Sequence, residues 1–427
     1  MRARLAMMVY VPAAALRPTA RPLSALSSGI LGGRGGSSDS SSSRRRSGSF
    51  ALGAATMATA AAVGGEEPAS CGARVRVASY NVLSSSLCEP GYFVKCARED
   101  LHPPTRLKRV QASLQKEIDA GAVICLQEVS QRWSGELHAF FAANGYQFST
   151  GLYGNKFNGY MGVAVAWPSK TYDLVGVDTC RVADTIVEAP RERGPKPGRV
   201  RKFLDRLGKA RRAMTDPPGR PPFETWREAS RKQNLLVTAT LKPTDGSGQF
   251  CVASYHMPCL FGSVEKERVM VIHSTLAAKR VAAVAKGAPY VLAGDFNVKP
   301  YDASYALLTG GSLPAEFADW APTPQPRPPA DAARAFAPTL DAPLVSAYAA
   351  ANGAEPDFTN FAYTRAMGDE RDAFVECLDY VFCSPGQWAV RGVKPLPSKA
   401  TMDITKPFPT KAEPSDHVLI AADLEVV

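Results

Sequence analysis

Short apolar runs that stop at a polar residue recur along most of the chain. The segment 289–297 reads Pro-Tyr-Val-Leu-Ala-Gly-Asp-Phe-Asn, so an apolar run ends at a glycine and then presents Asp295 and Asn297. An apolar run of about four to eight residues bounded by turn formers is typical of a strand buried on both faces. Comparable patterns predict strands at 74–83, 122–129, 146–153, 172–178, 234–241, 250–255, 377–382 and 414–420, and a turn that leads into a strand at 158–167.

Segments whose apolar residues recur at helical spacing lie between several of these predicted strands. The segment 105–120 places Leu107, Val110, Leu114 and Ile118 on one face, which predicts an amphipathic helix. We interpret Arg106 and Arg109 of this segment as part of its solvated face. Further helices are predicted at 131–144 and 264–286.

Polar side chains lie at the ends of these predicted strands. Taken alone, each has an ordinary explanation: Asn81 can cap a strand, Glu128 can form a salt bridge, and a lone histidine such as His256 is more often structural. A carboxylate at the end of an apolar run is nevertheless costly unless it is paired or binds a metal. One shared site is the economical explanation for the whole set, which comprises Asn81, Glu128, His256, Asp295, Asn297, Asp379, Asp416 and His417.

These residue types suit the hydrolysis of a phosphate ester by an in-line water. Glu128 can hold Mg²⁺, which prefers one or two hard oxygen ligands and keeps several waters. His417 can take a proton from water near neutral pH if an acid orients it, and Asp379 is the candidate for that role. Donors to the charge that develops on the phosphoryl oxygens are Asn81, Asn297 and His256. The chain lacks a Walker-type glycine loop, which argues against nucleotide-driven phosphoryl transfer.

Composition is that of a globular protein. The 427 residues, 45% hydrophobic and 21% charged, are enough for one large domain or two ordinary ones. No run approaches the roughly 18 apolar residues that a membrane span needs. The nine cysteines are scattered without a Cys-x-x-Cys pair, which favours reduced, buried thiols over a disulfide framework or a zinc ribbon.

The net charge of +10 is concentrated in two segments. Residues 1–70 are rich in Arg, Ser, Ala and Gly and almost free of acids, a composition typical of a mitochondrial or plastid transit peptide. The alternatives are a disordered leader, or translation that starts at Met57, and without targeting the protein is expected in the cytoplasm. Residues 74–427 are expected to form the catalytic domain.

The second basic segment is a predicted insertion at 184–232, rich in Pro, Gly, Arg and Lys. Residues 191–232 hold fourteen Lys or Arg and five acids, a charge that attracts polyanions in a salt-dependent way. The alternative is a solvated insertion without a role. Within it, Trp226 either stacks on a base or anchors the insertion to the core. A Pro-rich loop is predicted at 322–343.

Five motifs in order resemble the endonuclease/exonuclease/phosphatase superfamily: Ser79-Tyr-Asn-Val-Leu83, Leu126-Gln-Glu-Val129, Gly294-Asp-Phe-Asn297, Leu378-Asp-Tyr-Val-Phe382 and Pro414-Ser-Asp-His417. The resemblance covers residues 75–427, and the series through Leu344-Val-Ser-Ala-Tyr348 and Phe358-Thr-Asn-Phe361 is closest to the deadenylase, nocturnin and angel group.

What the resemblance implies is a deoxyribonuclease-I-like four-layer α/β sandwich, with two face-to-face sheets flanked by helices, and hydrolysis that depends on Mg²⁺, with Mn²⁺ as a substitute. It implies Glu128 as metal ligand with Asp416 close to the metal, Asp379 and His417 as the water-activating pair, and Asp295 and Asn297 as groups that position the phosphate. Asn81 is expected beside the metal as well, and the residues expected to contact the substrate are Asn158, Tyr160 and Asn360.

The expected activity is that of a 3′-exoribonuclease acting on single-stranded RNA. The alternative is a phosphatase or phosphodiesterase for a small nucleotide, a phosphorylated cofactor or a lipid-like phosphate ester, because one fold hosts many substrates. One departure concerns His256, which lies in Ser254-Tyr-His-Met-Pro-Cys259 where the group usually has Asn-Thr-His-Leu.

Overall fold

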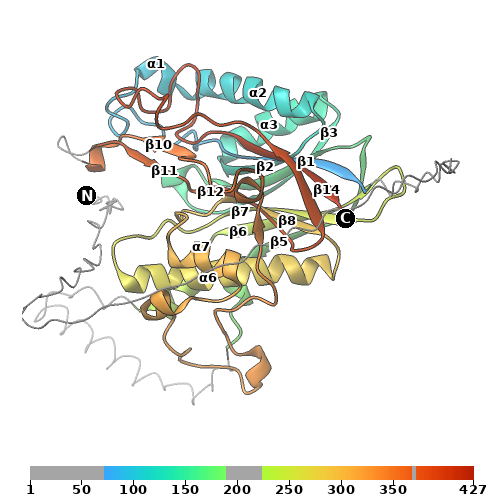
Figure 1. Cartoon of the computed structure of the whole chain (residues 1–427). Coiled ribbons are helices and arrows are strands. Elements are labelled where there is room, and N and C mark those ends of the chain that lie inside the picture. The colour runs from blue at the N-terminus through green and yellow to red at the C-terminus, as the bar shows by residue number, and fades with distance from the viewer. Residues whose placement is uncertain (1–71, 189–223, 368–371) are drawn as a thin grey trace, which may run out of the picture. The chain divides into compact units, whose positions relative to one another are not determined.

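The structure is a computed structural model that describes residues 72–188, 224–367 and 372–427; the thin grey trace in Figure 1 marks the others. The predicted leader and the centre of the predicted insertion, 189–223, therefore lie outside the described residues. No helix among the described residues is both long and apolar enough to cross a membrane.

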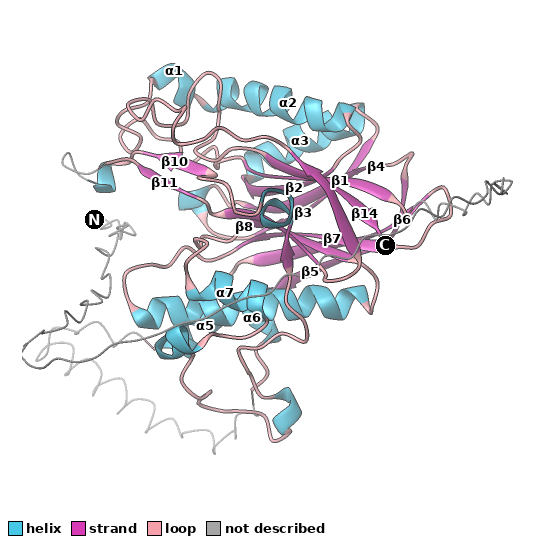
Figure 2. Ribbon diagram, viewed as in Figure 1, coloured by secondary structure: helices cyan, strands magenta, loops and turns pink. Residues whose placement is uncertain are grey.

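Two sheets of six strands form the centre of the molecule (Figure 2). The first has the order β13 (Trp388–Val393), β14 (Ile420–Val426), β1 (Arg74–Asn81), β2 (Val123–Val129), β4 (Gly162–Pro168) and β3 (Tyr146–Leu152). The second has the order β5 (Tyr172–Arg181), β6 (Leu235–Pro243), β7 (Phe250–His256), β8 (Tyr290–Asp295), β12 (Asp379–Cys383) and β9 (Val345–Ser346). A separate hairpin pairs β10 (Asn360–Ala362) with β11 (Phe374–Glu376).

Helices cover the outer face of each sheet, as Figure 1 shows. Beside the first sheet lie α2 (Pro103–Asp119) and α3 (Gln131–Ala143), and α6 (Val264–Ala285) and α7 (Ala303–Gly310) lie beside the second. Shorter helices are α1 (Arg98–Leu101), α5 (Thr225–Arg231) and α8 (Ala347–Asn352). Local sequence explains the ends of the long helices: prolines occupy the first turn of α2, and the Ser263 hydroxyl at the start of α6 accepts from the Lys266 N–H.

Three apolar cores hold the layers together. Val77, Val165 and Val252 belong to the core between the two sheets. Leu114 and Trp133 pack the helices α2 and α3 against the first sheet, and a third core packs α6 against the second sheet. The order helix, sheet, sheet, helix confirms the predicted four-layer α/β sandwich. All eight cysteines of the described residues are free thiols, as their spacing predicted.

One predicted strand is shorter than expected, and the structure decides between the two alternatives for Trp226. The strand expected over 414–420 begins only at Ile420, so His417 lies on the loop that leads into β14. Trp226 is 5% exposed and donates from its indole N–H to the Thr323 carbonyl at 2.8 Å. Its ring packs edge-on against Phe336, so it anchors α5 to the core and its face is not free to stack on a base.

The interpretation of Arg106 as part of a solvated face is wrong, because its side chain is completely buried. It lies one turn before Val110 on the inward stripe of α2, a spacing visible in the sequence. The guanidinium donates to the Val82, Leu83 and Pro414 carbonyls at 2.5, 2.8 and 2.6 Å, and it lies over the Trp133 ring. Arg106 therefore ties the end of β1 to the loop that carries His417.

We expect Arg106→Met to lower the free energy of unfolding by about 3 kcal/mol or more, because it leaves three buried carbonyls without their donor. The matched control is Arg109→Met on the same helix, which loses a partly buried ion pair with Asp100 and should cost less than about 1 kcal/mol. Urea unfolding of both variants measures the difference, and equal losses would contradict a special role for Arg106.

A pH dependence of stability follows from His273, which is fully buried in α6. Its Nε2 lies 3.0 Å from the Ala229 carbonyl and its Nδ1 3.1 Å from the Tyr255 hydroxyl. Burial lowers the pKa of His273 from 6.5 to about 4, so between these pH values the unfolded chain binds the extra proton. This contribution to stability is complete above about pH 6.5 and is lost as the pH falls toward 4, by up to about 3 kcal/mol.

The measurement compares the slope of unfolding free energy against pH for the wild type and His273→Gln. The wild type should lose more stability between pH 7 and pH 4.5 than the variant does. His138→Gln removes an exposed histidine on α3 and should keep the slope of the wild type. A slope unchanged by His273→Gln would contradict the assignment of a buried neutral imidazole.

Candidate active site

Three side chains of the second sheet are brought together by strand register. β7 and β8 are parallel and pair His256 with Asp295, while β12 runs antiparallel to β8 and pairs Asp379 with the same Asp295. His256, Asp295 and Asp379 therefore form a row across three neighbouring strands. The Asp295 carboxylate accepts from the Asn297 backbone N–H at 2.9 Å.

Gly294 makes this row possible by letting β7 and β8 approach closely. Its φ is +150°, and a Cβ at this position would lie 1.8 Å from the Tyr255 carbonyl oxygen. Only glycine satisfies both conditions. Two site residues also have left-handed backbones, Glu128 with φ 59° and Asn297 with φ 51°, which turns their side chains out of the regular strand pattern.

Asn81 and Glu128 come from the first sheet, at the ends of the parallel strands β1 and β2. The Asn81 amide nitrogen lies 2.9 Å from Asp295 Oδ2, 3.3 Å from Glu128 Oε1 and 3.4 Å from His417 Nε2. Glu128 Oε2 accepts from the Ser84 backbone N–H at 2.9 Å. Residues predicted from both sheets therefore meet at one place, with the Asn81 side chain at the centre.

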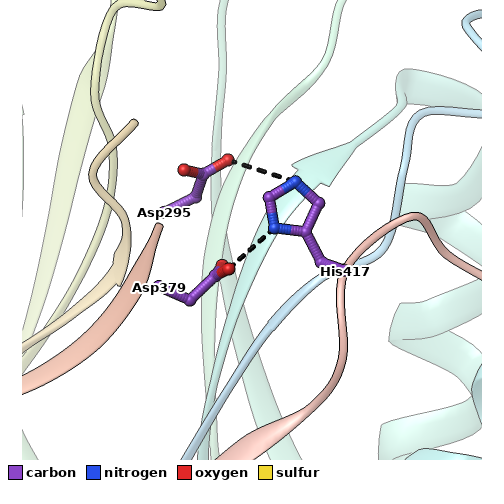
Figure 3. A group of neighbouring side chains, drawn as sticks. All are labelled: Asp295, Asp379 and His417. Atoms are coloured by element: carbon purple, nitrogen blue, oxygen red, sulfur yellow. Dashed lines mark hydrogen bonds and ion pairs between the residues drawn. The ribbon is translucent and has the colours of Figure 1, made fainter. Parts of the chain in front are cut away.

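Figure 3 shows His417 between two carboxylates. Its Nδ1 lies 2.7 Å from Asp379 Oδ2, and its Nε2 faces Asp295 Oδ2 at 3.6 Å. The Thr359 hydroxyl donates to the same Asp379 oxygen at 2.6 Å. The hydroxyl oxygen in turn accepts hydrogen bonds from the backbone N–H groups of Leu378 and Asp379. These bonds fix Thr359, which fixes Asp379 and in turn orients the imidazole.

The electrostatics of the pair follow from burial among acids. Burial raises the pKa of Asp379. Burial opposes the charged form of His417, but the carboxylates of Asp379 and Asp295 outweigh it and raise the pKa of the imidazole well above its usual range. Burial also raises the pKa of Asp416, to which the nearby Glu128 adds. The site thus carries an excess of negative charge.

The residues present fit a divalent cation. The carboxylates of Glu128, Asp295, Asp379 and Asp416 belong to this site, and hard oxygen donors of this kind suit Mg²⁺ or Mn²⁺. Ligand atoms of Asp295, Asp379 and His417 lie within 4.8 Å of one another and offer one candidate arrangement. The set predicted from sequence, Glu128 with Asn81 and Asp416, offers another.

The three residues expected to contact substrate lie near the site. The Asn158 carbonyl accepts from the Ser84 hydroxyl at 2.9 Å, and Ser84 in turn contacts Glu128, although the Asn158 side chain itself caps a short turn by accepting from the Asn155 N–H. Tyr160 is 46% exposed on the same loop. Asn360 is buried in β10 and pairs by its backbone with His417. Their contact with substrate stays a prediction.

Sequence reasoning missed three contributors to the site, Thr359, Tyr153 and Asn234. Tyr153 lies 3.1 Å from His256 Nδ1 through its hydroxyl, and Asn234 donates to the His256 carbonyl at 2.8 Å. Tyr153 ends the predicted strand 146–153, so the rule that singled out the other strand-end residues also applies to it. Thr359 is part of the Phe358-Thr-Asn-Phe361 motif. Asn234 gave no signal beyond its place at a strand start.

Sequence comparison finds relatives of this chain among known proteins. Nocturnin of Drosophila melanogaster is 24% identical over 377 residues, which are 83% of this chain and 47% of that protein. Carbon catabolite repressor protein 4 homolog 4 of Arabidopsis thaliana is 31% identical over 142 residues, or 32% of this chain and 27% of the relative. The chain therefore spans about half the length of the first relative, and its match to the second covers about a quarter of that protein.

Two solved structures share the fold. ANGEL2, described as a 2′,3′-cyclic phosphatase in complex with adenosine-2′,3′-vanadate, superposes with a TM-score of 0.59 at 17% identity, over 83% of this chain and 96% of that one. The human nocturnin catalytic domain with bound sulfate gives 0.51 at 18% identity, over 83% and 94%.

The family itself is shown by residues 78–417, which match the model of the Endonuclease/Exonuclease/phosphatase family. This range contains the strand-end residues described above, from Asn81 to His417, and confirms the resemblance seen in the sequence motifs. Enzymes of this family are phosphoester hydrolases that generally use divalent metals. The chain belongs to the Endonuclease/Exonuclease/phosphatase family.

Proposed function

We propose that the protein is a Mg²⁺-dependent phosphodiester hydrolase that removes nucleotides from the 3′ end of single-stranded RNA. The observation that carries the hydrolase assignment is the His417–Asp379 pair, whose atoms lie 2.7 Å apart, with the other imidazole nitrogen turned toward Asp295. An imidazole held in this way by a buried carboxylate can accept a proton from an attacking water.

Each protein group has a separate task in this scheme. Asp379 accepts a hydrogen bond from the Nδ1–H of His417, which leaves Nε2 as the atom that takes the proton of the water. Asn81 and His256 lie around Asp295 and donate to the phosphoryl oxygens as charge grows on them. Asn297 lies at the same end of β8 and positions the phosphate with Asp295.

Glu128, with Asn81 and Asp416 beside it, would hold the metal ion. When bound, a divalent cation supplies Lewis-acid polarisation of a phosphoryl oxygen and offsets the negative charge that keeps a proton on His417. The negative charge described above, built from four acidic side chains, supports this assignment.

The nucleic-acid assignment rests on similarity, on the composition of one basic segment and on two exposed aromatic rings. Nocturnin is a curated relative of most of the chain, and residues 191–232 carry fourteen basic side chains against five acids. The aromatic rings of Phe157 and Tyr160 are 61% and 46% exposed on the loop beside Glu128. Exposed rings next to a phosphate site suit the stacking of unpaired bases.

A second candidate is the hydrolysis of a nucleoside 2′,3′-cyclic phosphate or another small phosphate ester. The fold likeness to ANGEL2, solved with adenosine-2′,3′-vanadate, favours it. The same base, donors and metal ligands would serve both reactions, so the substrate distinguishes them and the site geometry does not.

The substrate prediction is tested with end-labelled oligo(A), mixed-sequence RNA, matching DNA and adenosine 2′,3′-cyclic phosphate, each with and without Mg²⁺. We expect a ladder that shortens oligo(A) from its 3′ end, and loss of that ladder with EDTA. Hydrolysis of the cyclic nucleotide without cleavage of any polymer would select the second candidate instead.

Glu128→Ala and Glu136→Ala form the matched pair for this assay, because Glu136 is an exposed acid on the neighbouring helix α3. Glu128→Ala should abolish the Mg²⁺-dependent activity, whereas Glu136→Ala should retain it. Full activity and an unchanged Mg²⁺ dependence in Glu128→Ala would refute the metal assignment.

The base assignment is tested by His417→Ala and Asp379→Asn. Both should lower kcat by about 10²–10⁴-fold and change KM little, because they remove proton transfer or its orientation but not binding. His138→Ala, on the surface of α3, should keep the wild-type kcat. A change confined to KM would make His417 a binding residue.

A further inference from the structure

His256 lies in the row of strand-end residues, and its two ring nitrogens have different neighbours. Nε2 faces Asp295 Oδ2 at 3.5 Å inside the site. Nδ1 points the other way, to the Tyr153 hydroxyl at 3.1 Å. A neutral imidazole carries its proton on one nitrogen only, so these neighbours decide whether His256 offers the site a donor or an acceptor.

Tyr153 determines whether Nδ1 of His256 carries a proton. Burial raises the pKa of the Tyr153 phenol, and the charges of Glu128 and Asp295 raise it further, so the hydroxyl keeps its proton. Its oxygen faces the Asn234 amide nitrogen at 3.4 Å, and an amide N–H can only donate. Among the described residues, His256 Nδ1 is the one acceptor within hydrogen-bond reach of that hydroxyl proton.

Asp295 determines whether Nε2 of His256 carries a proton. Its carboxylate is only an acceptor when ionised, so attraction to His256 Nε2 requires a proton on that nitrogen. Both sides of the ring therefore select the same form, with Nε2 protonated and Nδ1 accepting. Asn234 fixes the position of the residue as well, because its amide donates to the His256 carbonyl at 2.8 Å.

We propose that Tyr153 and Asn234 are positioning residues that hold His256 with Nδ1 accepting from the Tyr153 hydroxyl and the proton on Nε2, so that it donates a hydrogen bond to a phosphoryl oxygen of the substrate. The kinetic part of this assignment rests on the proposed phosphoester hydrolysis. Neither residue touches the reacting atoms, and both act through the imidazole. This assignment also gives a physical role to Asn234, which lies two residues after Lys232, the end of the basic segment.

The tautomer is measured on the full chain by ¹⁵N NMR with labelled histidine, whose two ring nitrogens have different shifts in each tautomer. His256→Gln identifies the signals, since the chain has five histidines. Spectra are taken with and without Mg²⁺, near neutral pH. We expect the Nε2–H form in the wild type, and a loss of that preference in Tyr153→Phe. An Nδ1–H form or an imidazolium in the wild type would overturn the assignment, whatever the substrate proves to be.

Kinetics test the consequence, with a matched control on β3. Tyr146 is a buried tyrosine whose hydroxyl donates to the Ile118 carbonyl at 3.1 Å, and it lies away from the site. Tyr153→Phe should lower kcat about 10- to 100-fold with KM within about twofold, as expected when the partner that orients a site histidine is removed. Tyr146→Phe should keep kcat. Equal kcat values in the two variants would overturn the positioning role.

A double-mutant cycle separates this role from a general loss of structure. In a His256→Gln background, Tyr153→Phe should change kcat by less than about twofold, because the group through which it acts is gone. Asn234→Ala should likewise change kcat by less than about twofold in the His256→Gln background. Additive losses would show that Tyr153 acts elsewhere. Absence of activity on every phosphate ester would contradict the proposed function, while the NMR result would still decide the tautomer.

Discussion

The amide of Asn81 joins the two halves of the site. Its nitrogen has two protons and contacts three groups: a carboxylate of its own sheet, Glu128, a carboxylate of the facing sheet, Asp295, and the imidazole of His417. A shift of one sheet against the other would break at least one of these contacts. The geometry of the site therefore depends on the relative position of the two sheets. Their described strands share no backbone hydrogen bonds, so contacts between side chains must fix that position.

A small polar cluster between the two sheets helps to fix their relative position. Gln127 of the first sheet donates to Ser254 of the second at 3.1 Å, and the Ser254 hydroxyl donates to the Leu126 carbonyl at 3.0 Å. These bonds lie one residue before Glu128 and two before His256. Apolar packing between sheets is non-directional and tolerates small slips, whereas buried hydrogen bonds penalise them. Together with Arg106, which fixes the end of β1, they define where the strand ends meet.

The sequence predicted the fold and the gathering of strand-end residues because both depend on local patterns. Asp295 and Glu128 stand out since a carboxylate after an apolar run requires a reason. Arg106 was misjudged because a charged residue on an inward helical position is rare, and its partners are backbone carbonyls that no motif reveals. Asn234 and Tyr153 could not be paired with His256 from sequence, because the pairing depends on sheet packing across distant segments. Substrate choice is equally invisible at this level, since the same groups suit more than one phosphate ester.

The left-handed backbones of Glu128 and Asn297 have an evolutionary consequence. Such a conformation costs a residue with a side chain about 1 kcal/mol or more, and glycine avoids that cost. Selection for heat resistance alone would therefore favour glycine at both positions and would erase a candidate metal ligand together with a phosphate-positioning amide. Homologues that have abandoned hydrolysis are the place to look for that exchange, and a glycine at either position would be an economical marker of a family member that only binds.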